Sequence, residues 1–265
     1  MAKKYEELTF TDDFMFCKVL SQDPQLCREL LSLILDREVG KLASINPQKP
    51  IEITADGRGV RFDIYAEDDD KTIYNVEMQN APSDHLAKRT RYSQGMIDLN
   101  LLNRGAKYRD LNRSYVIFIC QFNINKEAGL HRYRFANLCR EKPTIELGDE
   151  AEKIFLCADG TADDVSEKLK VFLNYIAGRR PADEFTQVLE NAVKSAREHI
   201  QWRQEYMTFL EIIEQEKEKA IIEERARTEQ ERKRADEEKK RADRLEAELE
   251  QLRRKLAEKL PDVHD

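Results

Sequence analysis

Glycine and proline are scarce in this chain: its 265 residues include nine glycines and seven prolines. That scarcity excludes collagen-like, linker-rich and low-complexity disordered chains. The sequence also lacks a CxxC pair, and its five cysteines, at positions 17, 27, 120, 139 and 157, are odd in number. We therefore expect reduced thiols, as in a cytoplasmic protein, that serve as small core hydrophobes.

Long hydrophobic runs are absent as well. The first residues, Met1–Glu7, hold no apolar signal core, so secretion is not expected. The longest apolar run, Tyr115–Cys120, is far shorter than the roughly 20 residues of a membrane helix, and no membrane partner is expected. The net charge of −7 argues against coating nucleic acid by bulk charge, although it permits a local basic patch.

Charged residues, in contrast, are abundant at 37%, against roughly 25% in an ordinary globular chain. They dominate the stretch from about 183 to 260, which contains neither glycine nor proline. This composition predicts one long helix or two helices joined end to end. Part of the chain is therefore expected to lie outside a globular core.

A heptad repeat marks the end of that stretch, where Lys233–Asp236 recurs seven residues later as Lys240–Asp243. Only the last two heptads have apolar residues at both seam positions. We expect a short coiled coil over about 242–260 that joins two copies of the chain, preceded by a charged helix stabilised by i,i+4 pairs. The alternative is a single solvated helix.

The first half of the chain mixes apolar runs with turn signals, which is typical of a mixed α/β core. The expected elements are helices beginning at Thr11 or Asp12 and after Pro24, strands at 51–54, 60–67, 72–80 and 115–122, turns at 56–59 and 68–71, and an amphipathic helix at 86–102.

The two strands of the expected hairpin each have one polar face. Strand side chains alternate, so Phe62, Ile64 and Ala66 should share a face, and Asp63 should point the other way with Arg61 and Tyr65. On the second strand, Glu77 and Gln79 share a face with Asn75. The hairpin register then brings Asp63 to about 5 Å from Glu77.

Two facing carboxylates repel each other unless a cation lies between them. Carboxylate oxygens suit Mg²⁺ or Mn²⁺, and such an ion would polarise a phosphate and activate a bound water. Gln79 could orient that water or a phosphate oxygen. The alternative is an ordinary half-exposed sheet face. Asp13 could approach the same place, or it could only favour the N-terminus of its own helix.

The following segment is basic, which suits a phosphate backbone laid over a metal. Between 81 and 113 it holds Lys88, Arg89, Arg91, Arg104, Lys107, Arg109 and Arg113, opposed by Asp84, Asp98 and Asp110. The candidates for contacting DNA are Lys88, Arg89, Arg91, Tyr92 and Gln94. The alternative is a solvated helix face.

With these motifs the chain resembles the recombination-promoting nuclease (Rpn) family of the PD-(D/E)xK nuclease superfamily. The matching blocks are DFMF at 13–16, VRFDIY at 60–65, NVEMQ at 75–79, RYS at 91–93, GAKY at 105–108, YVIFI at 115–119 and WRQEYM at 202–207. The resemblance covers roughly 8–207. It implies a restriction-endonuclease-like α/β fold with a mixed sheet flanked by helices, a divalent metal and DNA strand cleavage.

Carried over residue by residue, the resemblance makes Asp63 and Glu77 metal ligands and places them with Gln79 in the catalytic set. Gln79 stands where the superfamily usually has lysine, and Phe62 replaces its proline. A neutral glutamine cannot stabilise developing negative charge as lysine can.

We therefore expect a nuclease-like domain at 1–160, a helical extension at 161–207 and a long charged helix at 208–265. The expected function is a Mg²⁺-dependent or Mn²⁺-dependent DNA endonuclease linked to recombination or transposition. One alternative is a catalytically weak or inactive DNA-binding or scaffold protein that dimerises through its C-terminal helix. Another is a purely structural coiled-coil protein, which leaves the polar face of the hairpin unexplained.

Overall fold

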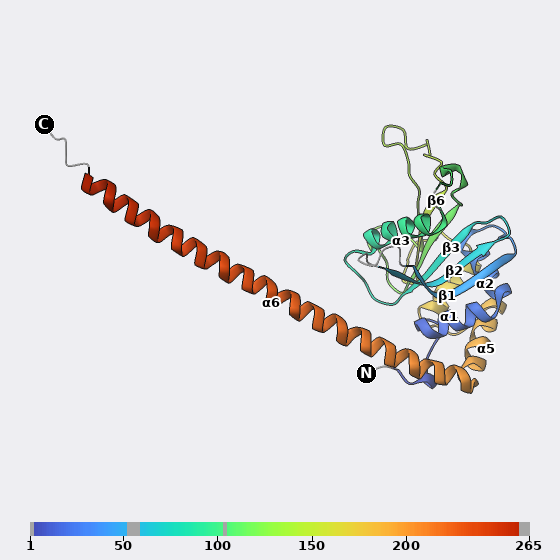
Figure 1. Cartoon of the computed structure of the whole chain (residues 1–265). Helices are drawn as coiled ribbons and strands as arrows, with labels where there is room; N and C mark the ends of the chain where they lie inside the picture. The colour runs from blue at the N-terminus through green and yellow to red at the C-terminus, as the bar shows by residue number, and fades with distance from the viewer. Residues whose placement is uncertain (1–2, 52–58, 103–104, 260–265) are drawn as a thin grey trace. The chain divides into compact units, whose positions relative to one another are not determined.

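The structure is a computed structural model that describes residues 3–51, 59–102 and 105–259 (Figure 1). The chain divides into two compact units, Met1–Arg203 and Gln204–Asp265. The first unit contains a sheet and the helices that cover it, and the second contains most of one long helix. The domain boundary predicted near 160 is not tested by this division and stays a prediction.

A mixed six-stranded sheet forms the centre of the first unit. The strands are β1 (Leu42–Ile51), β2 (Val60–Asp68), β3 (Ile73–Gln79), β4 (Ser114–Cys120), β5 (Arg132–Phe135) and β6 (Ala151–Cys157), in the spatial order β1-β2-β3-β4-β6-β5. The pairs β1–β2, β2–β3 and β5–β6 are antiparallel, whereas β3–β4 and β4–β6 are parallel. The α/β class predicted from the sequence is confirmed.

Helices cover both faces of this sheet. They are α1 (Asp13–Gln22), α2 (Pro24–Leu35), α3 (Leu86–Leu101), α4 (Glu167–Ile176) and α5 (Glu184–Glu198), with short 3₁₀ turns at Tyr5–Glu7 and Tyr108–Asp110. Helix α1 packs on β1 and β2 and contacts α5. Helix α2 packs on β1 and contacts α4, while α3 packs on β4 from the opposite side (Figure 1). Four of the five cysteines, all except Cys139, are buried in this unit as free thiols.

The sequence pattern missed most of the first strand. A strand was predicted at 51–54, but β1 ends at Ile51, and 52–54 lie outside the described residues, as does the predicted turn at 56–59 except Gly59. Pro47 and Pro50 make the segment read as a loop. Because β1 is an edge strand, it can lack a backbone N–H donor on its open side, and Gln48 between the two prolines has a positive φ of 49° that interrupts the regular strand.

The prediction that the side chains of β2 alternate strictly between the two faces of the sheet was also wrong. Phe62 was expected to share a face with Ile64, opposite Tyr65. Instead the rings of Phe62 and Tyr65 stack with centroids 6.1 Å apart, in the cluster of apolar side chains beneath α3. The strand therefore departs from regular alternation between 62 and 65, which is where Asp63 lies.

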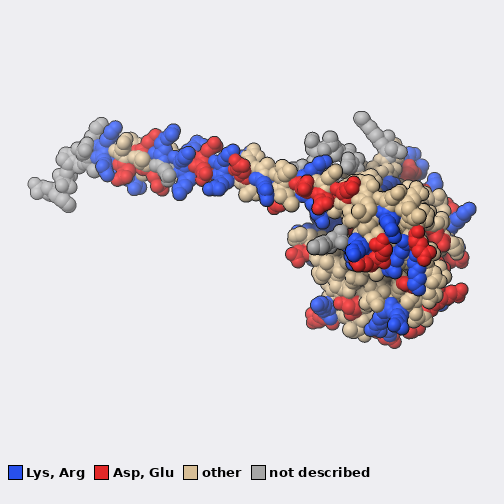
Figure 2. Space-filling view, turned by 90° about the horizontal axis from the view of Figure 1, so that it is seen from below, with Lys and Arg blue, Asp and Glu red and all other residues tan. Residues whose placement is uncertain are grey.

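The glycine-free stretch forms two helices rather than one, the second alternative allowed by the sequence. Helix α5 ends at Glu198, and α6 (Ile200–Lys259) continues for 60 residues. Charges of both signs are interspersed along α6 (Figure 2), with i,i+4 ion pairs such as Arg227–Glu231 at 3.4 Å. Among the described residues, no helix combines the length with the apolar character that crossing a bilayer requires.

Candidate active site

The β2–β3 hairpin brings Asp63 and Glu77 together. The register pairs Ile64 with Val76, the positions next to the two acids. Oδ2 of Asp63 accepts a hydrogen bond of 3.0 Å from the backbone N–H of Met78, so this carboxylate reaches across to β3. Two acids from neighbouring strands therefore share one small region, as the alternating pattern of the hairpin predicted.

Glu77 is withdrawn from water to a greater degree than Asp63, so the open polar face considered from the sequence is wrong for Glu77. The Glu77 side chain is only 2% exposed, and Asp63 is half-buried. Burial, followed by the negative charges of Glu77 and Asp13, raises the pKa of Asp63 to about 8. Burial also raises the pKa of Glu77, against the opposing effect of Arg89. Without a cation, such a cluster of acids favours bound protons over charge.

Arg89 provides the positive charge beside this cluster. Its Nη2 lies 2.6 Å from Oε2 of Glu77, and its Nη1 donates a 3.1 Å hydrogen bond to Oε1 of Gln79. Its guanidinium also lies over the ring of Phe118, 5.3 Å from the ring centroid. The planar fork of arginine thus bridges two side chains of β3 and rests on β4, which a lysine could not do with the same geometry.

Gln79 is engaged at both ends of its amide. Its Oε1 accepts from Arg89, and its Nε2 donates a 2.7 Å hydrogen bond to the carbonyl of Ala81. The sequence suggested that Gln79 orients a water or a phosphate oxygen. In this structure its amide instead orients Arg89.

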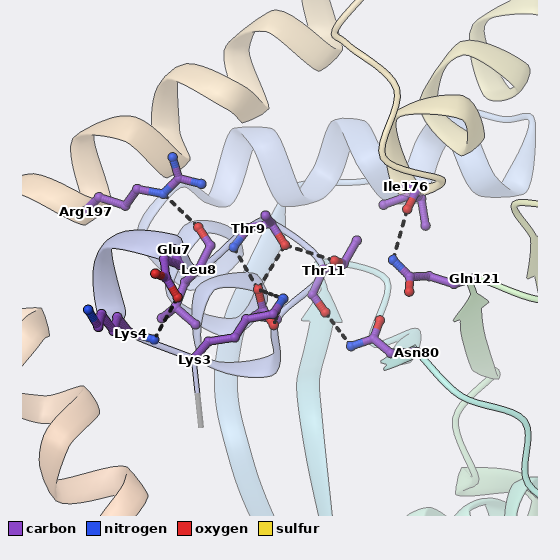
Figure 3. Close-up of polar contacts among 11 residues, drawn as sticks. Lys3, Lys4, Glu7, Leu8, Thr9, Thr11, Asn80, Gln121, Ile176 and Arg197 are labelled. Carbon is purple, nitrogen blue, oxygen red and sulfur yellow. Dashed lines mark hydrogen bonds and ion pairs between the residues drawn. The ribbon is translucent and has the colours of Figure 1, made fainter. Parts of the chain in front are cut away.

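A third acid, Asp13, approaches from the first turn of α1. Its charge raises the pKa of both Asp63 and Glu77, and burial raises the pKa of Asp13 itself. Asn80, directly after β3, holds this end of α1 in place by donating a 2.8 Å hydrogen bond to the carbonyl of Thr11 (Figure 3). The sequence left two interpretations of Asp13 open, and the structure supports its approach to the acids.

A cleft of about 800 Å³ opens above Glu77, between the start of β2 and the outer face of α3. Besides Glu77 and Phe62, its charged and aromatic lining consists of Arg61, His85, Lys88, Arg89, Arg91 and Tyr92. Four of these six side chains carry a positive charge, so Glu77 lies in a basic recess, with Asp63 beside it on β2. We call this recess the basic cleft.

Gln94 does not belong to the basic cleft, although the sequence suggested it as a DNA contact. It is buried, and its Nε2 donates to Asp98 at 2.9 Å and to Ser114 at 2.7 Å. Residues four apart share a helix face, and Thr90 and Gln94 both lie on the buried face of α3. Of the other basic residues, Arg113 pairs with Glu150 at 2.6 Å, and Arg104 lies outside the described residues.

The donors present fit a hard divalent cation. Mg²⁺ is commonly held by one or two carboxylates, with waters and phosphate oxygens as its other ligands. Asp63 and Glu77 supply two such carboxylates, and burial, the main cause of their raised pKa values, disfavours their charged forms unless a cation lies beside them. In the part of the chain that is described, no group of three or more His, Cys, Asp or Glu side chains is arranged to hold an ion.

Comparison with known proteins gave one match. A family model described as PD-(D/E)XK nuclease family transposase matches residues 10–256. Neither the curated proteins nor the solved structures that were compared gave a match. The matched range includes the sheet, the three acids, the basic cleft and most of α6.

The buried acid on β2 generates a prediction about stability. Because the pKa of Asp63 is raised to about 8 in the folded state, protonated Asp63 stabilises the fold at low pH, and that contribution is lost as pH rises from about 4 to 8. In EDTA we expect Asp63→Asn to match wild type near pH 4. At pH 8 it should be more stable by at least about 1 kcal/mol, or roughly 2–4 °C in melting temperature.

Thermal unfolding followed by circular dichroism across this pH range measures the effect. Glu127→Gln, which alters an exposed acid, is the matched control and should follow wild type at every pH. An identical pH dependence for wild type and Asp63→Asn would contradict the raised pKa.

Proposed function

The chain belongs to the PD-(D/E)XK nuclease family transposases, and we propose that it is a metal-dependent DNA endonuclease that hydrolyses phosphodiester bonds. The observation that supports this most directly is the proximity of half-buried Asp63 to buried Glu77, which lines the basic cleft. Membership of the family supports a nuclease-like function, and the term transposase supports a link to recombination or transposition.

In this proposal Asp63 and Glu77 hold Mg²⁺ or Mn²⁺. Such an ion, when bound, would polarise a phosphate oxygen and lower the pKa of a bound water. The backbone N–H of Met78 fixes the orientation of the Asp63 carboxylate. Because burial favours the protonated form of Asp63 near neutral pH, binding of a cation is expected to release a proton.

In this proposal Arg89 supplies the positive charge that a lysine on β3 would supply in the family that the chain resembles. Gln79 stands at that position and is neutral, but it holds one end of the Arg89 guanidinium while Glu77 holds the other. A positive group placed there before the reaction can stabilise negative charge that develops on a phosphate. Gln79 is then a positioning residue for Arg89.

DNA would lie in the basic cleft with its backbone against Lys88 and Arg91. Both side chains line the cleft with Arg61 and Tyr92, on elements that flank Glu77. Contacts of this kind position a duplex or strand without reading its sequence. The chain as a whole carries a net charge of −7, so the attraction for DNA is local to this recess. Its free thiols suit a cytoplasmic setting.

The runner-up function is an inactive DNA-binding or scaffold protein. It is favoured by the 2.6 Å contact through which Arg89 already neutralises Glu77, together with the missing lysine. Titration calorimetry with Mg²⁺ and Mn²⁺ separates the two functions. A nuclease should bind these ions in a way that Glu77→Gln abolishes, whereas a scaffold should show no binding that depends on Glu77.

Supercoiled plasmid in Mg²⁺ provides the direct test of cleavage. Asp63→Asn and Glu77→Gln should each lower the nicking rate by roughly 10³-fold, because loss of a metal ligand removes several kcal/mol of transition-state stabilisation. Glu127→Gln, an exposed acid outside the cleft, should cleave at the wild-type rate. Equal nicking by wild type and Asp63→Asn would remove the catalytic role of the acids.

Substitution of Arg89 tests its role in the same assay. Arg89→Ala should lower the rate by about 10²-fold to 10³-fold, the usual loss of a preorganised charged or hydrogen-bonding group. Arg89→Lys should recover only part of that loss, because lysine cannot bridge Glu77 and Gln79 with one planar fork. Arg109→Ala, which alters an exposed arginine, is the control. Full activity of Arg89→Ala would show that Arg89 is only a structural partner of Glu77.

We further propose that α6 makes a homodimer through its last heptads. Leu245, Leu249 and Leu252 are exposed along the helix, at the spacing of a coiled-coil seam. A chain ending at Thr228 should therefore sediment as a monomer, while the full chain sediments as a dimer. If the truncated chain sediments as the same oligomer as the full chain, self-association must instead involve the first unit, Met1–Arg203.

A further inference from the structure

A second recess lies on the other side of the first turns of α3. It measures about 640 Å³, within the range typical of ligand sites. Leu86, Ala87 and Thr90 of α3 form one side, and the rings of Phe122, Phe135 and Phe155 contribute the aromatic surface. The basic cleft uses the neighbouring helix positions His85, Lys88 and Arg89, and Ser83 lines both recesses. We call the second recess the aromatic pocket.

The aromatic surface of this pocket is held rigidly. Phe155 is buried and stacks on Phe118 with centroids 5.7 Å apart and an angle of 25°. Phe135 meets Phe155 edge to face at 5.9 Å and 84°, and its side chain is 48% exposed. A fixed ring with an open face suits a flat apolar ligand that can stack on it.

The charge of the aromatic pocket differs from that of the basic cleft. Its charged lining comprises Lys126 and Lys153 against Asp84 and Asp159, so the net charge is zero. The buried amide of Asn123 is already used by Leu130 and Tyr133, at 2.9 and 2.7 Å. The pocket therefore offers stacking to an uncharged group and little specific hydrogen bonding.

We propose that the aromatic pocket receives an unstacked nucleobase from the DNA strand whose phosphates lie in the basic cleft. The inference rests on the proposed function. One helix separates the two recesses, a span of about 10 Å, which corresponds to about three nucleotides of a stacked strand. Ser83 lines both recesses, so a strand that follows the basic cleft reaches the aromatic pocket, and a nucleic-acid strand is favoured over a peptide because the cations of the cleft match its phosphates.

A base in this pocket would define the class of substrate. Extruding a base from a duplex costs a few kcal/mol, and the cost is least for a base that is already unpaired. Stacking without hydrogen-bond readout is also tolerant of sequence. The favoured substrate is therefore unpaired or distorted DNA, which the protein would bind with little preference for sequence.

Binding without cleavage provides the test, with fluorescence anisotropy of labelled strands in EDTA. The two probes are a thymidine 15-mer and a 15-unit abasic strand of the same phosphate charge. Phe135→Ala should weaken binding of the thymidine strand by about 5-fold to 150-fold, the equivalent of 1–3 kcal/mol for base stacking, and should change binding of the abasic strand by less than about 2-fold.

Two further variants separate stacking from folding. Leu138→Ala alters a side chain that is 52% exposed on the same segment and does not line the pocket, so it should bind both strands as wild type does. Phe135→Leu keeps an apolar side chain but removes the ring, and should lose affinity for the thymidine strand as Phe135→Ala does. Wild-type binding by Phe135→Ala, an equal loss on both strands, or full rescue by leucine would each overturn the proposal.

The nuclease assay distinguishes failure of this inference from failure of the proposed function. Cleavage that depends on Asp63, combined with unaltered strand binding by Phe135→Ala, would overturn the base pocket alone. Base-dependent binding through Phe135 in a protein that cleaves no DNA would support the pocket and overturn the endonuclease.

Discussion

The site depends on holding two carboxylates of neighbouring strands together, with Glu77 buried beneath α3 and Asp63 half-buried beside it. Burying like charges is unfavourable unless a proton or a cation neutralises them, and burial, followed by the charges of Glu77 and Asp13, raises the pKa of Asp63. Arg89 neutralises one acid from above, through a contact of 2.6 Å with Glu77. Helix α3 is consequently both the cover of the sheet and the source of the positive charge that the covered acids require.

The sheet topology explains how so many elements reach one place. Because β3 runs parallel to β4, Glu77 lies beside Phe118, and the guanidinium of Arg89 rests on that ring while it holds Glu77. Because β2 runs antiparallel to β3, Asp63 arrives at the same level from the opposite direction. Asn80 then ties the end of β3 to the start of α1, which brings in Asp13.

The local sequence pattern was sufficient to predict the hairpin, helix α3 and the proximity of Asp63 to Glu77. Each of these features is determined by residues within about 20 positions of one another, through the periodicity of the element and a short turn. It failed where tertiary context decided. No strand was predicted over most of β1, because its prolines are typical of a loop and are compatible with a strand at the edge of the sheet. Regular alternation along β2 also failed at Phe62, whose ring stacks on Tyr65. The pairing of Arg89 with Glu77 and Gln79 depends on how α3 lies on the sheet, and no spacing along the chain encodes that.

The prolines at the sheet margin also affect how copies of the molecule can meet. Pro47 and Pro50 each lack a backbone N–H, and Gln48 between them has a positive φ of 49°, so this part of β1 offers an irregular row of donors to another strand. At the other margin, β5 is only four residues long. Both edges of the sheet are therefore poor templates for pairing with another strand. This disfavours fibres that would form by edge-to-edge pairing of sheets.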